Sequence, residues 1–333
     1  DILRITNSMI VNISIADMNR NLERMQNVQK QMTSGVKYQN ASDNPTDVTK
    51  VMQLNTSLTS LSQYNSNIKN TSSFLDATDT ALGQAGEVLQ NIRLQLVSAG
   101  VAGVSSSDLV AIKDTVNQDI AQFADILNTK FGGKYVFGGT SGDAQPVRAV
   151  TSDGNTKLVY CDTSGNEVPD PSDSLSTKMK VGISEGVTVS YSATVTDIMS
   201  TPVSSTDAFN IRKVFSDIVN NLDGNVANSD GTLSPDSATA TTNLAGIDLS
   251  NIDKVIAKLL AVRAQVGAVT NRMTSELNQN DAQKENVTAL LTKTEGTDIT
   301  EATIQFASLQ SVFLASIQAS AKIIQPTLMD YLK

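Results

Sequence analysis

Every seventh residue from position 54 to position 96 is leucine or isoleucine, and no other feature constrains the fold of this chain more strongly. The ridge consists of Leu54, Leu61, Ile68, Leu75, Leu82, Leu89 and Leu96. A straight α-helix drifts by about 20° per heptad against such a repeat, so a strict repeat indicates left-handed supercoiling around a partner helix. The positions four residues after each ridge residue are mostly small or polar, which favours a long helix in a bundle over a two-stranded zipper. From residue 46 to about 99 this helix would be roughly 80 Å long.

A second long-helix pattern runs over residues 248–293 and supplies a partner for the first. Its apolar residues recur at intervals of four and three, as expected for one buried helix face. The four that we expect to pack against the leucine ridge are Val255, Leu259, Val262 and Val266. The two patterns together predict an antiparallel helical rod, with both ends of the chain at the same end of the rod.

The two ends of the chain carry amphipathic stripes that have no obvious partner within the rod. Residues expected to make contacts between subunits are Met18, Leu22, Met25, Phe306, Leu309, Phe313 and Ile317. Isolated helices are marginally stable in water, so we expect residues 1–40 and 297–333 to be disordered in the monomer and to order on assembly. The alternative is that these two helices pair within one monomer. Ser34-Gly35 predicts the end of the first helix, and Asn44-Pro45 predicts the start of the next.

The middle of the chain differs in composition from both helical halves. Residues 140–206 are rich in Thr, Ser, Asp and Gly, and residues 157–161 and 187–195 alternate as β-strands do. We therefore expect a mainly α protein with three parts. These are terminal helices (1–40 with 297–333), a helical rod (41–139 with 207–296) and a small β-rich outer domain (140–206) that faces solvent.

Composition excludes several classes of function. The chain has no histidine and one cysteine, Cys161, so it has no His-based nucleophile relay, no imidazole ligand and no intrachain disulfide. Its 34 acidic residues outnumber its 25 basic ones, which argues against a nucleic-acid partner. No apolar run exceeds four residues, which predicts neither a membrane span nor a cleavable secretory signal.

Two segments approach known ligand-binding motifs and fall short of them. Residues 133–140 have the frame of a phosphate-binding loop, but Gly139 stands where the motif needs lysine. Residues 162–173 place Asp162 and other polar residues at calcium-loop spacing, but Glu167 stands where the loop needs glycine. We therefore predict no catalytic site, no cofactor and no metal.

Short motifs at both ends of the chain resemble those of bacterial flagellins and their hook-associated relatives. The N-terminal half carries Arg4-Ile5-Thr6-Asn7-Ser8-Met9, Met32-Thr33-Ser34-Gly35 and Ala41-Ser42-Asp43-Asn44-Pro45. The C-terminal half carries Arg263-Ala264-Gln265-Val266-Gly267-Ala268-Val269-Thr270-Asn271-Arg272 and Asp298-Ile299-Thr300-Glu301-Ala302. The resemblance implies a structural protein of the extracellular flagellum whose terminal helices assemble into a tube. It also implies export in the unfolded state, without a cleavable signal peptide and with an export chaperone.

Two further segments are most similar to the family branch that joins the hook to the filament. They are Gly133-Lys134-Tyr135-Val136-Phe137-Gly138-Gly139-Thr140 and the ending Gln325-Pro326-Thr327-Leu328-Met329-Asp330-Tyr331-Leu332. This branch implies an adaptor whose partners are other hook-associated proteins and flagellin. The alternative is the filament subunit itself. An enzyme in the outer insert lacks the necessary residues, and an unrelated coiled-coil scaffold would leave the paired end motifs unexplained.

Overall fold

A computed structural model describes residues 7–38, 40–101, 103–162, 164–168, 173–200, 210–227 and 232–324. The chain divides into two compact units. The terminal unit comprises Asp1–Ser62 and Ala282–Lys333, and the central unit comprises Gln63–Asp281. The β-rich segment therefore belongs to the same compact unit as the helices that precede and follow it in sequence.

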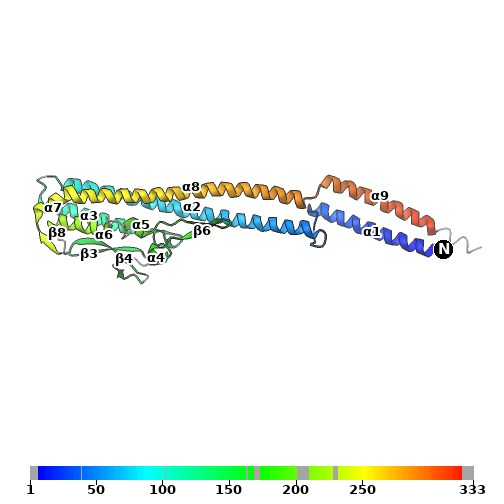
Figure 1. Ribbon diagram of the computed structural model, residues 1–333, viewed down its shortest axis with the longest axis horizontal. Coiled ribbons are helices and arrows are strands. Elements are labelled where there is room, and N and C mark those ends of the chain that lie inside the picture. The colour runs from blue at the N-terminus through cyan, green and yellow to red at the C-terminus, as the bar shows by residue number, and fades with distance from the viewer. Residues whose placement is uncertain are drawn as a thin grey trace, which may run out of the picture. The chain divides into compact units, whose positions relative to one another are not determined.

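Two long helices run antiparallel through the central unit (Figure 1). They are α2 (Pro45–Ala99) and α8 (Leu249–Glu295), whose outer ends extend into the terminal unit. Helices α3 (Ser106–Leu127) and α6 (Ile211–Leu222) pack on one side of this pair, together with the β-strands. The long helix pair predicted from the heptad repeat is confirmed.

The start of α2 follows from a local capping interaction. The Asn44 side-chain oxygen accepts a hydrogen bond from the backbone N–H of Asp47 at 3.3 Å, and the helix begins at Pro45. Helix α1 (Asn7–Ser34) ends before Gly35, whose φ of +74° lies in the left-handed region. Both helix boundaries predicted from sequence are confirmed.

The leucine ridge of α2 lies in the core of the central unit. Ile68, Leu75, Leu82, Leu89 and Leu96 are all at most 1% exposed. The second buried row of α2 differs from the one considered from sequence, because it follows each ridge residue by three positions and not by four. Its members are Thr71, Thr78, Ala85, Ile92 and Ala99. Buried threonine is tolerated there because the Thr78 hydroxyl donates to the Phe74 carbonyl of its own helix at 2.8 Å.

The facing row of α8 is buried as well. Val255, Leu259, Val262 and Val266 are at most 4% exposed and belong to the same apolar core as the α2 ridge. At the other end of the ridge, Leu61 is 8% exposed and Leu54 is half-buried, and both lie in the terminal unit.

The strands form small antiparallel sheets, of which the main one packs on α3 and α6 and the hairpin of residues 180–190 packs on the long helices. The main sheet has the order β3 (Val147–Ser152), β4 (Asn155–Cys161), β5 (Glu167–Val168), with Val147 opposite Tyr160. The two-stranded sheets are β1 (Lys130–Phe131) with β2 (Lys134–Tyr135), β6 (Lys180–Ser184) with β7 (Val187–Ser190), and β8 (Asn225–Ala227) with β9 (Leu233–Pro235). Short helices α4 (Asp173–Ser176) and α5 (Val195–Met199) lie among them.

The β-rich segment shares the core of the helices and does not form a sheet with one fully solvated face. Val147, Leu158 and Tyr160 are at most 2% exposed and belong to that core. Strands also occur outside residues 140–206, because residues 225–243, predicted to belong to the helical rod, contain β8, β9 and α7 (Ser237–Asn243). Strands β8 and β9 have three residues each, too few to show the apolar–polar alternation that predicts a strand.

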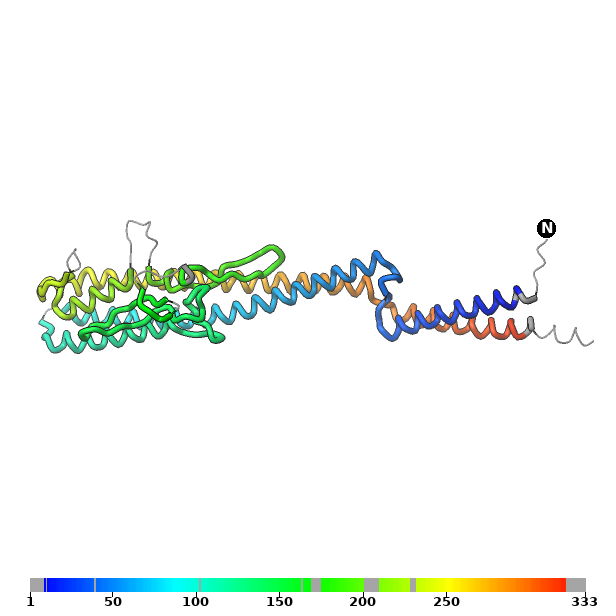
Figure 2. Tube along the Cα trace, turned by 90° about the horizontal axis from the view of Figure 1, so that it is seen from below, coloured from blue at the N-terminus to red at the C-terminus, as the bar shows by residue number. Residues whose placement is uncertain are grey.

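In the terminal unit, α1 lies side by side with α9 (Ile299–Ile324) (Figures 1 and 2). The described residues of both terminal segments are thus helical and paired within one chain, as in the alternative considered from sequence. Among the described helices, none combines the length and the hydropathy that crossing a membrane requires.

Candidate assembly surface

Helices α1 and α9 meet along a seam that is only partly apolar. The Ser14 and Ser320 hydroxyls are 2.7 Å apart, and the Asn21 amide donates to the Leu309 carbonyl at 3.1 Å. Val28 and Ala302 are buried, at 9% and 4% exposure. Such a seam offers little apolar burial, and apolar burial is the main source of stability for a helix pair.

Six of the seven residues predicted to make contacts between subunits are partly covered within one chain, and their contacts with other subunits stay a prediction. Met18, Leu22 and Met25 of α1 and Phe306, Leu309 and Phe313 of α9 are half-buried. Their three- and four-residue spacing continues the stripes that contain Ser14, Asn21 and Ser320. Ile317, the seventh predicted residue, is 42% exposed.

A backbone clamp joins the inner ends of the two terminal helices. Val36 and Gly296 form an antiparallel bridge, with hydrogen bonds from the Lys37 N–H to the Glu295 carbonyl (2.6 Å) and from the Thr297 N–H to the Gly35 carbonyl (3.0 Å). Beside the clamp, the Tyr38 hydroxyl donates to the Asp47 carboxylate at 2.7 Å, which raises the pKa of Tyr38.

Helix α9 begins with a side-chain cap. The Asp298 carboxylate accepts hydrogen bonds from the backbone N–H groups of Thr300 (2.8 Å) and Glu301 (3.2 Å). Two of the sequence motifs therefore have local structural roles, because Asp298 starts α9 and Asn44 starts α2. The Ala302 that ends the first of these motifs is the small residue that lets α9 approach α1.

Beyond the seam, α9 carries apolar side chains on its remaining sides. Ile304 is 66% exposed, Leu314 is 55% exposed and Val312 is 51% exposed, and at 100° per residue they point in three different directions. No charged residue occurs from Ala302 to Ala321. A helix that is apolar all round is normally buried. The helix α1 covers one side of α9 and leaves the others open.

Helix α1 adds to this exposed apolar surface at its outer end. Met9, Ile13 and Ile15 are 48%, 54% and 49% exposed. We define the assembly surface as the large exposed apolar residues of α1 and α9, namely Met9, Ile13, Ile15, Ile299, Ile304, Val312, Leu314 and Ile317. The periodic pattern selected the dominant stripe of each helix. Of the assembly surface it selected Ile317 alone, because the other residues do not form a single stripe.

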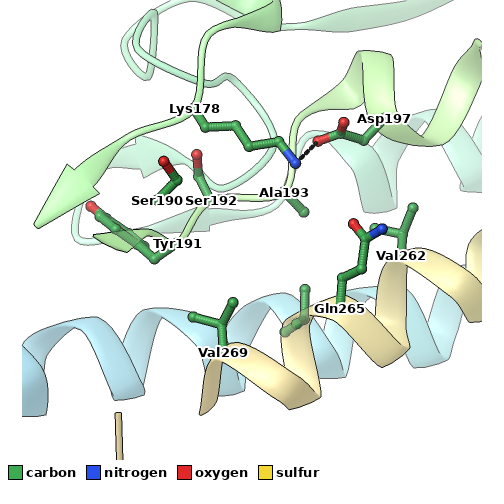
Figure 3. A pocket seen from close by; sticks show the side chains of 10 residues that line it. Lys178, Ser190, Tyr191, Ser192, Ala193, Asp197, Val262, Gln265 and Val269 are labelled. Atoms are coloured by element: carbon green, nitrogen blue, oxygen red, sulfur yellow. Dashed lines mark ion pairs between the residues drawn. The ribbon is translucent and has the colours of Figure 1, made fainter. Parts of the chain in front are cut away.

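The central unit contains a small hollow between the β6–β7 region and α8 (Figure 3). It measures about 70 Å³ and lies between the Lys178–Asp197 ion pair (3.1 Å) and side chains of α8, among them Gln265 and Val269. A hollow of this size, bordered by an ion pair and polar side chains, has room for bound water molecules.

The two segments that approach ligand motifs form ordinary turns. Gly132 and Gly133 both have positive φ in the β1–β2 connection, as expected for a backbone turn. The Asp162 carboxylate accepts hydrogen bonds from the N–H groups of Ser164 and Asn166, both at 2.8 Å, which lowers the pKa of Asp162. Within the described ranges, no three Asp, Glu or Cys side chains come together as metal ligands would. Cys161 is buried at the end of β4, and burial raises the pKa of its thiol.

Two family descriptions match the chain, one at each end. Residues 5–142 match the bacterial flagellin N-terminal helical region, and residues 249–332 match the bacterial flagellin C-terminal helical region. Together they span the greater part of the chain and include α1, α2, α3, α8 and α9.

Relatives and solved structures agree with this match. A flagellin of Bacillus subtilis is 24% identical over 316 residues, which cover 90% of each protein. The flagellar hook-associated protein 3 of Legionella pneumophila has a TM-score of 0.59 at 15% identity, with 73% of this chain and 98% of that one covered. Xanthomonas campestris FlgL has a TM-score of 0.52 at 16% identity, with 71% and 99% covered. The fold is therefore that of these proteins.

Proposed function

The chain belongs to the bacterial flagellin family and is a structural protein of the flagellum, and we propose that it is the adaptor between hook and filament. In this role it binds a hook-associated protein on one side and flagellin on the other, and it packs side by side with further copies of itself. It acts by contact alone and catalyses no reaction.

The observation that carries this proposal is the set of exposed apolar side chains on the sides of α9 that α1 leaves open. In one chain α1 covers a single side, and Ile304, Val312 and Leu314 remain more than half exposed. Burying such side chains contributes about 1.5–3 kcal/mol each. Neighbouring subunits that pack around α9 would provide this burial, so the assembly surface is where we place the contacts between subunits.

The choice of adaptor over filament subunit is supported by the likeness to hook-associated folds, which extends over 73% and 71% of this chain. The structures of hook-associated protein 3 and FlgL are covered almost completely by this chain, without a large unmatched domain. The junction-like segment at residues 133–140 points the same way. The Bacillus subtilis relative keeps flagellin as the second candidate.

The route to the flagellum follows from the same family. We propose that the chain functions outside the cell and reaches that place in an unfolded state, with a chaperone covering its terminal helices before export. The weak intrachain seam supports this proposal, because α1 and α9 bury few side chains against each other.

Self-assembly of the purified full-length chain tests the choice between adaptor and filament. The chain is brought to rising ammonium sulfate concentration, sedimented and viewed by negative-stain electron microscopy. The adaptor should remain monomeric or form short oligomers, and it should add to preformed hook-associated or flagellin ends. Long regular filaments of this chain alone would overturn the adaptor proposal in favour of flagellin.

A further inference from the structure

The carboxylate of Asp248 occupies a buried position in the central unit, where α7 joins α8. Residues at intervals of three and four along α8 form its buried stripe, and Asp248 continues that stripe between Leu244 and Ile252. Asp248 is 2% exposed, as little as the apolar residues on either side of it. Its place is the last residue of η1 (Leu244–Asp248), a π-helical turn that joins α7 to α8.

Asp248 has a neutral hydrogen-bond partner. The Asn221 side-chain amide of α6 donates to Asp248 Oδ2 at 2.6 Å, and Asn221 is itself 6% exposed. A buried carboxylate with a neutral donor keeps most of the cost of desolvating its charge. The site therefore favours the protonated acid.

The charged groups around Asp248 do not offset this cost. Helix α6 contributes Asp217, another carboxylate, which is half-buried one turn before Asn221. Helix α7 has no titratable side chain. The nearest cation of α2, Arg93, is bound to Asp253 of α8 at 2.7 Å. Lys113 of α3 is bound to Asp223 at 2.6 Å.

The Asp248 side of η1 is packed into the unit, whereas Ala245, Gly246 and Ile247 of the same turn are exposed. The end of α2 comes so close to η1 that a Cβ on Gly100 would lie 2.9 Å from the Cβ of Ala245. Leu244 and Ile252 are at most 1% exposed. The Asp248 carboxylate therefore lies on the closed side of the turn, away from solvent.

We propose that Asp248 is a proton-dependent weak point, at which protonation stabilises the central unit and ionisation loosens it. The central unit is then more stable in mild acid than at neutral pH. The corner of α6, η1 and α8 is the first part to open as pH rises. A π-helical turn suits such a role, because its wider hydrogen-bonding pattern is less stable than that of an α-helix.

The sign and size of the effect follow from linkage. The pKa of Asp248 is raised to about 6, chiefly by burial; the Asn221 hydrogen bond lowers it in part, and the neighbouring Asp217 carboxylate adds to the rise. The same group in an unfolded chain has a pKa of about 3.9. The folded state thus binds the proton more tightly, and its stability falls as pH rises through 6. For one such group the unfolding equilibrium constant increases about tenfold between pH 5 and pH 8.

The test is urea unfolding of the full-length chain at pH 5 and pH 8, followed by circular dichroism, for the wild type and Asp248→Asn. Asparagine keeps the shape and can still accept the Asn221 hydrogen bond, but it does not titrate. From pH 5 to pH 8, we expect the unfolding equilibrium constant of the wild type to increase about tenfold more than that of Asp248→Asn. The same pH dependence in both proteins would overturn the proposal.

Two further variants serve as controls for the comparison of the wild type with Asp248→Asn. Asp253→Asn removes an exposed, ion-paired carboxylate five residues along the chain, and it should retain the wild-type difference between pH 5 and pH 8. Asp248→Leu restores an apolar residue to the stripe and serves if Asp248→Asn does not fold. The gain in the free energy of unfolding of Asp248→Leu over the wild type should be larger at pH 8 than at pH 5. An equal gain at both pH values would contradict the proposal.

Discussion

Arg263 of α8 binds the carboxylate of Asp79 on α2 with two hydrogen bonds. Nε lies 2.7 Å from Oδ1, and Nη2 lies 2.9 Å from Oδ2. Arg263 opens the Arg-Ala motif noted in the sequence, and the structure gives that residue a partner 184 positions away along the chain. The contact fixes the register of the two antiparallel helices from outside the apolar core, and it does so with a geometry that lysine cannot reproduce.

Removing this ion pair should produce a small, pH-dependent loss of stability. The hydrogen bonds from Arg263 hold the pKa of Asp79 below its usual range. A lowered folded-state pKa means that the pair stabilises the fold above the unfolded pKa of about 3.9 and loses this effect as pH falls below it. Both side chains are 45% exposed, so Arg263→Gln should cost at most about 1 kcal/mol at pH 7.

Urea unfolding at pH 7 and pH 3 measures this cost, and an NMR titration of the Asp79 carboxyl measures its cause. In Arg263→Gln the Asp79 pKa should return toward the ordinary range. The Arg263→Lys variant is the control and should recover only part of the loss. An unchanged Asp79 titration in Arg263→Gln would show that the pair does not exist in solution.

Truncating a ridge leucine should destabilise the central unit strongly. Leu75 is 0% exposed, so Leu75→Ala removes buried methyl groups and leaves a cavity, at a cost of about 2–5 kcal/mol. Leu94 is 62% exposed on the same helix, and Leu94→Ala should change stability by less than about 0.5 kcal/mol. Urea unfolding of both variants gives the comparison. Equal effects would mean that the heptad ridge is not the core of the helix pair.

A buried asparagine should hold the β6–β7 hairpin onto the long helices. The Asn280 amide, 0% exposed, donates to the Ile183 carbonyl at 2.8 Å. Asn280→Ala leaves that carbonyl without its donor, which costs about 1–3 kcal/mol and should expose the hairpin to proteases. Asn67, which is only half-buried and donates to the Gly182 carbonyl at 3.1 Å, offers the matched variant Asn67→Ala.

Limited proteolysis with mass spectrometry locates the first cut in each variant. Cleavage near residues 180–190 should be fastest in Asn280→Ala, slower in Asn67→Ala and slowest in the wild type. If the hairpin of Asn280→Ala resists cleavage as well as that of the wild type, the hydrogen bond does not anchor it.

A charge on the open side of α9 should prevent assembly without unfolding the monomer. Leu314 is 55% exposed in one chain, so Leu314→Asp should shift monomer stability by less than about 0.5 kcal/mol. In an assembly that buries this position, an unpaired carboxylate would cost several kcal/mol. Co-sedimentation with preformed flagellar ends measures incorporation, and thermal unfolding measures stability. Leu314→Met, which keeps the apolar character, should still be incorporated, and incorporation of Leu314→Asp would remove Leu314 from the assembly surface.

The assembly surface also shows what helical periodicity could not predict. Met18, Leu22 and Phe313 lie on the strongest stripes of their helices, and periodicity therefore selected them. A stripe indicates that a face is covered, but the same pattern results from a partner in the same chain and from a partner in another. In the structure these residues are partly covered within one chain, and Ile304 and Leu314 are open.

Periodicity and local capping together determined the elements of this protein. A heptad of leucines requires a long helix with a partner, Asn44 and Pro45 start that helix, and Gly35 ends the one before it. These are short-range effects, in which spacing and backbone preference act within a few residues, and the sequence displays them directly.

Tertiary structure alone decided which residues meet across the chain. The second buried row of α2 contains threonine and alanine beside Ile92, and these small residues are core residues because other elements of the unit cover them. Asp248 and Asn280 lie in the core although they are polar, because partners 27 and 97 residues away supply their hydrogen bonds. The free energy of burial depends on which surfaces meet in three dimensions, and neither composition nor spacing along one helix contains that information.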